Sequence, residues 1–222
     1  MTGGSADPRR GRERDGDRRR ERGTRSRRNV TRRAVDIASL DGLDGLSFGR
    51  LADDLELSKA GIQTLFRTKE ALQLATVATA GEVFTEAVVA PADAASAGAP
   101  RLRALIDRWI DYAAQPLFPG GCFWGANLPV FDSRPGPVRD ALRQQRRGWL
   151  HTLAREFDLT AAARGHGTGD TDLAVFQIDA VLNAANIALR LDEPSSVEKV
   201  HRVVDDLLGP GHSPAGTDSS PR

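Results

Sequence analysis

The chain has 222 residues, enough for one large or two small domains, and no stretch approaches the roughly 20 consecutive apolar residues of a membrane span. Cys122 is the single cysteine, which excludes an internal disulfide framework, and the Arg-rich N-terminus has no apolar stretch behind it, so we expect a cytoplasmic protein without a secretory signal. The net charge is only +1, but residues 1–28 hold 11 Arg against 5 Asp and Glu, which leaves the rest of the chain acidic.

Residues 1–28 form an N-terminal arm that lacks hydrophobic periodicity, is rich in Gly and Arg, and mixes both charges. This composition predicts a disordered segment. Two interpretations of the arm are open: it is a solvated tail, or it is a non-specific anchor that follows DNA phosphates or enters a minor groove. Arg25, Arg27 and Arg28 lie next to the first predicted helix and are the best candidates for the second role.

Four helices are predicted to follow the arm. Apolar residues at i, i+4, i+7 and i+8 predict a helix over 29–40, which two Asp-Gly pairs then end. Ser47 is a suitable N-cap for the second helix, and Ser58 is one for a short third helix. Thr68 is the expected N-cap of a longer fourth helix, which runs to about Val89.

Residues 90–100 have the composition of a linker. Apolar stripes and helix-starting prolines predict five further helices: 101–114, 122–128, 137–157, 170–191 and 194–208. No strand-like alternation of any length is present, so the prediction is an all-α fold of about nine helices. The helix over 170–191 is apolar nearly all round, so one side is expected to meet a second subunit. The predicted dimer interface comprises Ile178, Val181, Leu182, Ala185, Leu189, Val200 and Val204.

Residues 47–72, SFGRLADDLELSKAGIQTLFRTKEAL, have the layout of a helix-turn-helix that binds DNA. In such a motif the exposed N-terminal residues of the second helix meet the DNA, and helix starts and lysines contact phosphates. The predicted DNA-binding residues are Ser47, Ser58, Lys59, Ala60, Gly61, Gln63, Thr64 and Lys69. For each of them the alternative is a solvated surface position or a plain helix cap. Residues 29–72 hold six basic side chains against seven acidic ones, so the arm is a further candidate source of phosphate attraction.

Residues 31–77 resemble the N-terminal domain of the TetR family of transcriptional regulators. The matching residues are Gly45, Ser47, Leu51-Ala52, Leu57-Ser58-Lys59, Phe66 and Lys69-Glu70-Ala71-Leu72. The chain departs from the family pattern at Gln63 and Leu65, where the family commonly has a tyrosine and an imidazole. The family's tyrosine–phosphate contact therefore does not carry over, and Gln63 is instead a candidate for a hydrogen bond to an adenine edge.

The segments FPGGCFWGAN and FDSRPGPVRDAL are similar to a subgroup of this family that carries Gly-Gly-Cys with aromatics and then Arg-Pro-Gly-Pro-Val-Arg. In the family this C-terminal domain encloses a small-molecule pocket, typically apolar with a few polar groups, and forms the dimer. The predicted ligand-binding residues are Trp109, Tyr112, Cys122, Phe123, Trp124, Asn127, Phe131, Trp149, Phe176 and Asn183. Two alternatives stay open: the aromatics are simply core, and Cys122 is either a small buried hydrophobe or an oxidant sensor.

The resemblance implies four segments: a disordered arm (1–28), a helix-turn-helix DNA-binding domain (29–75), a ligand-binding and dimerisation domain (76–209) and a disordered tail (210–222). It implies a homodimeric regulator, more often a repressor in this family, which a small apolar or aromatic effector releases from its operator. Enzyme chemistry is not expected because the four histidines lack metal-ligand spacing, and neither a cofactor nor a metal site is predicted. The rival interpretation is an all-α small-molecule-binding protein or enzyme with no specific DNA site.

Overall fold

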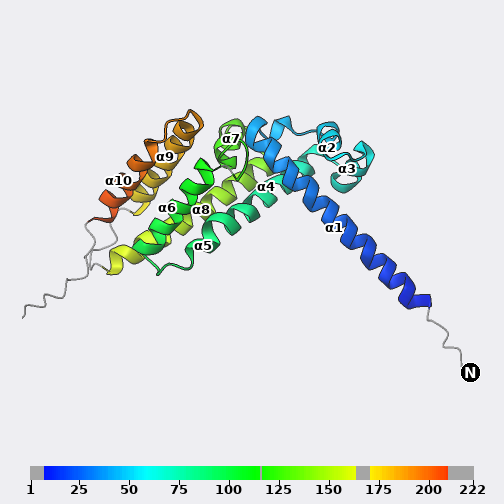
Figure 1. Ribbon diagram of the computed structural model, residues 1–222, viewed down its shortest axis with the longest axis horizontal. Coiled ribbons are helices and arrows are strands. Elements are labelled where there is room, and N and C mark those ends of the chain that lie inside the picture. Colours follow the sequence, from blue (N-terminus) through cyan, green and yellow to red (C-terminus); the bar gives the residue numbers. More distant parts are fainter. Residues whose placement is uncertain (1–7, 116, 164–170, 210–222) are drawn as a thin grey trace, which may run out of the picture. The chain divides into compact units, whose positions relative to one another are not determined.

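A computed structural model describes the following parts of the chain: residues 8–115, 117–163 and 171–209 (Figure 1). Every regular element in these parts is a helix, which confirms the predicted all-α class. The helices form two compact units. Unit 1 comprises Met1–Glu82 with Phe118–Ala141, and unit 2 comprises Val83–Leu117 with Leu142–Arg222. The predicted DNA-binding domain, residues 29–75, is one continuous segment. Unit 1 also includes a second segment, Phe118–Ala141, from the middle of the chain.

Helix α1 spans Pro8–Asp41, so it begins well before the first helix that the sequence predicts. The arm expected to be disordered over 1–28 is helical from the start of α1 onward, while residues 1–7 lie outside the described residues. Composition explains the difference. Arg and Glu are strong helix formers, and opposite charges stand at the stabilising i, i+4 spacing, as in Glu21 and Arg25.

The chain after α1 passes through a short 3-10 helix, η1 (Leu43–Gly45), into two short helices, α2 (Phe48–Leu55) and α3 (Lys59–Phe66). Both helices pack on α1 and on each other. Leu51 of α2 and Ile62 of α3 are buried in this three-helix core. The apolar spacing of α2 and α3 therefore fixes which face of each helix turns to α1 and which face stays in solvent.

Ser47 and Ser58 are the N-caps of α2 and α3, as the sequence predicts. The Oγ of Ser47 accepts a hydrogen bond from the backbone N–H of Arg50 at 3.1 Å, and that of Ser58 accepts one from Gly61 at 3.1 Å. A Cβ at Gly61 would lie 2.9 Å from the Ser58 Oγ, so a side chain at this position would crowd the capping hydroxyl. Glu56, in the left-handed region at φ 53°, ends α2.

Helix α4 (Lys69–Phe84) continues through a π-helical turn, η2 (Thr85–Val89), into the short helix α5 (Ala90–Ala92). Thr68 caps α4 as predicted, because its Oγ1 accepts a hydrogen bond from the N–H of Ala71 at 3.0 Å. The predicted linker over 90–100 therefore begins as helix. One unbroken run of helical backbone crosses from unit 1 into unit 2.

Helix α7 (Phe123–Phe131) belongs to unit 1 and packs against α1 (Figure 1). The sequence predicts a helix that ends before Pro129, but α7 continues through this proline to Phe131. A proline lacks the N–H that would donate to the preceding turn, and the burial of Phe131 offsets that loss. Through α7, part of the predicted ligand-binding domain joins unit 1.

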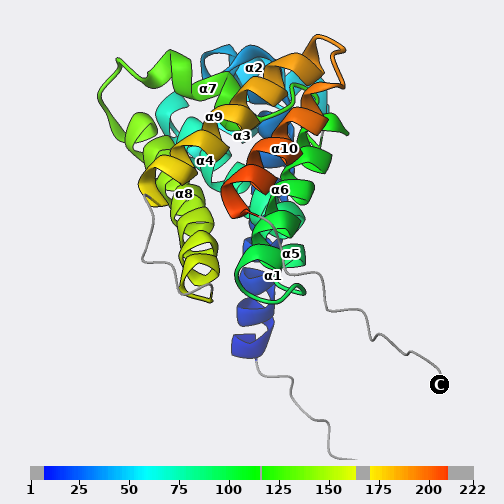
Figure 2. The ribbon, with the colours of Figure 1, turned by 90° about the vertical axis from the view of Figure 1, so that its left-hand side faces the viewer.

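Unit 2 is built from four longer helices: α6 (Ala99–Ala114), most of α8 (Pro137–Ala163), α9 (Thr171–Arg190) and α10 (Ser196–Leu208). Helices α9 and α10 run side by side, and both pack on α6 (Figure 2). Pro137 occupies the first turn of α8 as predicted, while the helix extends past its expected end at Phe157. The predicted tail, residues 210–222, lies outside the described residues.

Glu156 on α8 is a buried carboxylate that holds the start of α6. Its Oε2 accepts a hydrogen bond from the N–H of Gly98 at 2.9 Å, and its Oε1 accepts two from the guanidinium of Arg155. Burial alone would raise the pKa of Glu156. The Gly98 and Arg155 hydrogen bonds and the charges of Arg155 and Arg101 outweigh burial, and the pKa lies below its ordinary value of 4.5.

Replacing Glu156 by glutamine is expected to lower the free energy of unfolding at pH 7 by about 1–3 kcal/mol, because charge-assisted hydrogen bonds are lost. A carboxylate with a lowered folded-state pKa stabilises the fold above its ordinary pKa, and this contribution disappears as the pH falls through the folded-state pKa. The difference between wild type and E156Q should therefore shrink below about pH 4.5. Urea unfolding between pH 7 and pH 3 measures it, with the exposed Glu198→Gln as control; a constant difference would contradict the assignment.

Candidate functional site

The short helix α3 presents one face to solvent and one face to the core of unit 1. Residues four apart share a helix face. Ile62 and Phe66 form the buried face of α3, and Lys59 and Gln63, which are also four apart, lie together on an exposed face. The predicted DNA-binding residues are all exposed: Ser47, Ser58, Lys59, Ala60, Gly61, Gln63, Thr64 and Lys69. The helix-turn-helix is thus assembled with its N-terminal, predicted DNA-contacting residues accessible.

Besides the capping serines Ser47 and Ser58, two of these exposed side chains form hydrogen bonds within their own unit. The Oγ1 of Thr64 donates a hydrogen bond to the carbonyl of Ala60 at 2.8 Å, one turn back in α3. The Nζ of Lys69 donates to the carbonyl of Asp44 at 2.7 Å and so ties the start of α4 to η1. Lys59 and Gln63 are therefore the side chains on α3 best placed to reach a phosphate and a base edge.

Arg27 on α1 contacts the far end of α3. Its Nη1 donates a hydrogen bond to the carbonyl of Leu65 at 2.6 Å, and its guanidinium lies 4.4 Å from the centroid of the Phe66 ring. This contact satisfies one of the carbonyls that a helix C-terminus leaves without an intrahelical partner. The sequence names Arg25, Arg27 and Arg28 as possible DNA anchors. In the structure Arg27 ties α1 to α3, while Arg25 and Arg28 are exposed.

Half of the predicted ligand-binding residues lie in unit 1: Cys122, Phe123, Trp124, Asn127 and Phe131. The ring of Phe123 packs edge to face against Phe118 and Trp124, and the thiol of Cys122 is buried. Asn127 is fully buried, and its amide makes three hydrogen bonds to backbone groups. The contacts of these side chains are those of a core.

The remaining predicted ligand-binding residues lie in unit 2. Trp109, Tyr112 and Trp149 form an aromatic cluster with Phe84, whose ring centroid is 5.3 Å from those of Tyr112 and Trp149 in edge-to-face geometry. Asn183 is exposed and donates its amide to a carbonyl of its own helix. The predicted ligand-binding set, which also includes the exposed Phe176, thus comprises two packed clusters and two exposed positions.

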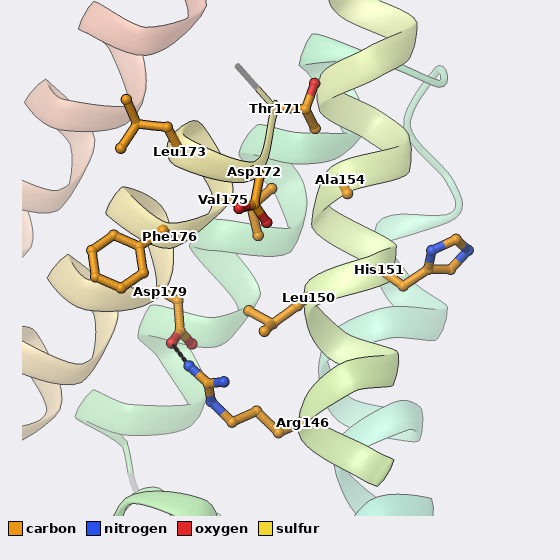
Figure 3. Close-up of a pocket in the computed structure, with 10 residues that line it drawn as sticks. All are labelled: Arg146, Leu150, His151, Ala154, Thr171, Asp172, Leu173, Val175, Phe176 and Asp179. Atoms are coloured by element: carbon orange, nitrogen blue, oxygen red, sulfur yellow. Dashed lines mark hydrogen bonds and ion pairs between the residues drawn. The ribbon is translucent and has the colours of Figure 1, made fainter. Parts of the chain in front are cut away.

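A groove with a cavity volume of about 640 Å³ lies between α8 and α9 in unit 2 (Figure 3). Leu150 of α8 points toward α9, and an ion pair joins Arg146 to Asp179 at 2.5 Å. Phe176 is the one predicted ligand-binding residue that lines the groove. The spacing of Arg146, Leu150 and Ala154 at i, i+4 and i+8 indicates a shared face of α8, but the facing helix is not evident from such spacing.

The predicted dimer interface is wrong for most of its residues, because they are buried within the chain. Five of them are at most 2% exposed: Ile178, Leu182, Ala185, Val200 and Val204. Helices α6 and α10 cover this side of α9, so it cannot meet a second subunit. Val181 and Leu189 are half-buried beside them.

The opposite side of α9 is apolar and exposed. Leu173, Phe176 and Ile187 are 50%, 67% and 62% exposed, and a second groove between α9 and α10 is lined by Phe176, Val203 and Leu207. Of the described helices, only α9 is long and apolar enough to cross a membrane, a criterion that core helices of soluble proteins also meet. Exposed apolar side chains gathered on one face of a helix are typical of an interaction site.

Residues 98–204 match the family model described as tetracyclin repressor-like, C-terminal domain. No curated protein sequence matches the chain. The fold is similar to that of a TetR transcriptional regulator from Chloroflexus aurantiacus, at 24% identity over 83% of this chain and 94% of that chain, with a TM-score of 0.75.

Two further solved structures have the same fold. A TetR-family regulator from Streptomyces coelicolor is 22% identical over 84% of this chain and 94% of that chain, with a TM-score of 0.69. AibR, in complex with isovaleryl coenzyme A and operator DNA, is 17% identical over 82% of this chain and 96% of that chain, with a TM-score of 0.59. The fold of 82–84% of this chain is thus shared with proteins of very different sequence.

Proposed function

Since the chain belongs to the TetR family of transcriptional regulators, we propose that it is a cytoplasmic homodimeric repressor that leaves its operator when a small apolar or aromatic effector binds. The chain is a DNA-binding regulator and not an enzyme. The observation that carries the proposal is the capped, accessible recognition helix α3, whose exposed residues surround the buried pair Ile62 and Phe66.

In this proposal α3 enters the major groove of a half-site with its N-terminal end. Gln63 reads a base edge, for which adenine is the natural partner of an amide. Lys59 and the capped helix starts at Ser47 and Ser58 contact phosphates. Because the helix-turn-helix is close to neutral, the Arg-rich N-terminal part of α1 supplies additional phosphate attraction through exposed side chains such as Arg25 and Arg28.

The second copy of the chain docks on the exposed face of α9. This face carries Leu173, Phe176 and Ile187, and the groove beside α10 offers a recess for side chains of the partner. A dimer presents two recognition helices, so the operator should hold two half-sites whose spacing follows the dimer geometry. This assignment replaces the face predicted from the sequence.

The groove between α8 and α9 is the proposed effector site. Its volume lies within the roughly 300–1,000 Å³ of small-molecule pockets, and it combines apolar walls with the polar groups of Arg146 and Asp179. The complex of AibR with isovaleryl coenzyme A and operator DNA supports an effector with an apolar body. Because the helix that begins with α4 runs from unit 1 into unit 2, a change in its tilt would alter the separation of the two recognition helices.

The proposal is tested by gel shift with the DNA upstream of the protein's own coding region, against a scrambled duplex of equal length. We expect a preference for the upstream DNA, and an affinity that falls steeply with salt, by a log–log slope of about −0.9 for each neutralised phosphate. A protein that binds neither duplex at low salt would instead be the small-molecule-binding protein or enzyme of the rival interpretation.

The same assay tests the effector site. Aromatic acids and short acyl coenzyme A thioesters are added to the complex of protein and operator. A compound that releases the wild type should fail to release Ala154→Trp, in which the indole fills the groove. Ala162→Trp, at an exposed position of α8, is the matched control and should respond like the wild type. Equal release of all three proteins would place the effector elsewhere.

A further inference from the structure

Residues 118–134, here called the clamp segment, belong to unit 1 although the chain enters and leaves this stretch from unit 2. The covalent crossings lie between Leu117 and Phe118 and between Ala141 and Leu142. The segment contributes α7, which packs along α1. It is therefore a second chain connection between the helix-turn-helix unit and unit 2, in addition to the helix that begins with α4.

Asn127 is the centre of the contact between the clamp segment and the turn that follows α1. Its Oδ1 accepts a hydrogen bond from the N–H of Leu43 at 2.7 Å. Its Nδ2 donates to the carbonyls of Ala38 at 3.1 Å and Phe123 at 2.7 Å. The carbonyl of Leu43 accepts a further hydrogen bond from Gln73 of α4 at 3.0 Å. Both backbone groups of Leu43 are thus held by buried side chains from other elements.

Two more contacts fix the clamp segment to the same turn. The N–H of Gly120 donates to the Oγ of Ser39 at 2.9 Å, and a Cβ at Gly120 would lie 1.8 Å from the Ser39 carbonyl oxygen, so a side chain there is excluded. Arg134 forms an ion pair with Asp44 of η1. The contacts bracket the end of α1 and the whole of η1, from which the chain passes within a few residues to the N-cap of α2.

We propose that Asn127 is a positioning residue for DNA recognition. It holds the turn between α1 and η1 in the geometry from which α2 and α3 start. The inference rests on the proposed function and adds to it a residue that positions the helix-turn-helix. In this inference the Asn127 side chain binds backbone groups of unit 1 and not a ligand, since three hydrogen bonds already engage its buried amide.

The test compares Asn127→Ala with Gln144→Ala, which removes an exposed amide side chain on α8. In the full-length dimer, N127A should bind the operator at least about tenfold more weakly, because buried hydrogen bonds are lost at the turn. Binding to the scrambled duplex, which depends on phosphate contacts, should stay unchanged. Hydrogen exchange over residues 39–46 should accelerate in N127A. Q144A should match the wild type in all three measurements.

Asn127→Asp provides a conservative variant. A protonated aspartic acid has one donor and one acceptor and so reproduces part of the amide, whereas a buried carboxylate repels the carbonyls of Ala38 and Phe123. Operator affinity of N127D relative to wild type should therefore rise as the pH is lowered from 8 to 5.5. If N127A does not fold, Arg134→Ala provides the test instead, because it removes the exposed ion pair between the clamp segment and Asp44. Its expected loss of operator affinity is about two- to threefold.

Three outcomes would overturn the inference: a folded N127A that binds the operator like the wild type, an equal loss of affinity for both duplexes, or an unfolded N127A together with an R134A that binds normally. Each of these leaves the proposed function intact as long as the wild type prefers its operator. If the wild type shows no preference between the duplexes, the proposed function fails first.

Discussion

Phe176→Asp is expected to convert the dimer into monomers and to weaken operator binding by about two orders of magnitude or more. The ring is 67% exposed on the proposed dimer face of α9, with Leu173 one turn before it. In the dimer this ring would be buried, so an aspartate would leave an unpaired charge in an apolar interface. Binding of the second half-site is intramolecular in a dimer, and a monomer loses that gain.

Light scattering after gel filtration measures the mass, and gel shift at equal protomer concentration measures the affinity. Leu159→Asp is the matched control, because Leu159 is 45% exposed on α8 away from the face of α9. It should remain a dimer and bind the operator normally. Leu182→Asp is unsuitable as a test, since Leu182 is buried in the chain and the variant would lose its own core. A Phe176→Asp protein that keeps the dimer mass would contradict the assigned face.

Gln63→Ala is expected to reduce discrimination at one base pair of each half-site by about 1–3 kcal/mol, the contribution of a bidentate contact between an amide and adenine. Affinity for unrelated DNA should be unchanged, because Gln63 carries no charge and phosphate contacts dominate non-specific binding. The effect comes from a side chain that is exposed beside the buried Ile62, so stability should not change. Binding to a set of operators with single base-pair changes locates the affected position.

Gln144→Ala, an exposed glutamine on α8, is the control and should keep the wild-type preference. Lys59→Ala gives the contrasting pattern: weaker binding to every sequence and a salt slope that is smaller by about one. If Gln63→Ala leaves every base preference unchanged, the base contact belongs to another residue. Thr64 is the next candidate, although its hydroxyl already bonds the Ala60 carbonyl.

The helix-turn-helix is predictable in detail because its determinants are local. The N-caps Ser47, Ser58 and Thr68 follow from the residue type at a helix start, and each hydrogen bond spans three residues. The burial of Ile62 and Phe66 follows from helical spacing. The long N-terminal extent of α1 cannot be predicted in this way, because a charged, glycine-containing segment is compatible with either disorder or a helix stabilised by ion pairs.

The ligand-binding prediction shows where residue type stops being informative. Asn127 lies in an apolar segment, and a polar group there suits either a pocket or a buried backbone partner. Its main partner, the N–H of Leu43, is 84 residues away in the chain. Trp124 and Phe123 are likewise side chains that suit a core as well as a pocket. Only the packing of α7 on α1 separates these possibilities.

Helix α9 gives the clearest case. Its periodicity places Phe176 and Ile187 on one apolar side and Ile178 and Leu182 on another, and the sequence offers no means of telling these two sides apart. The family, the helices, their caps and their apolar faces can all be read from the chain, because each depends on residues close together in sequence. The partner of each face is set by where α6 and α10 pack, and that depends on contacts between distant segments, which no local pattern records.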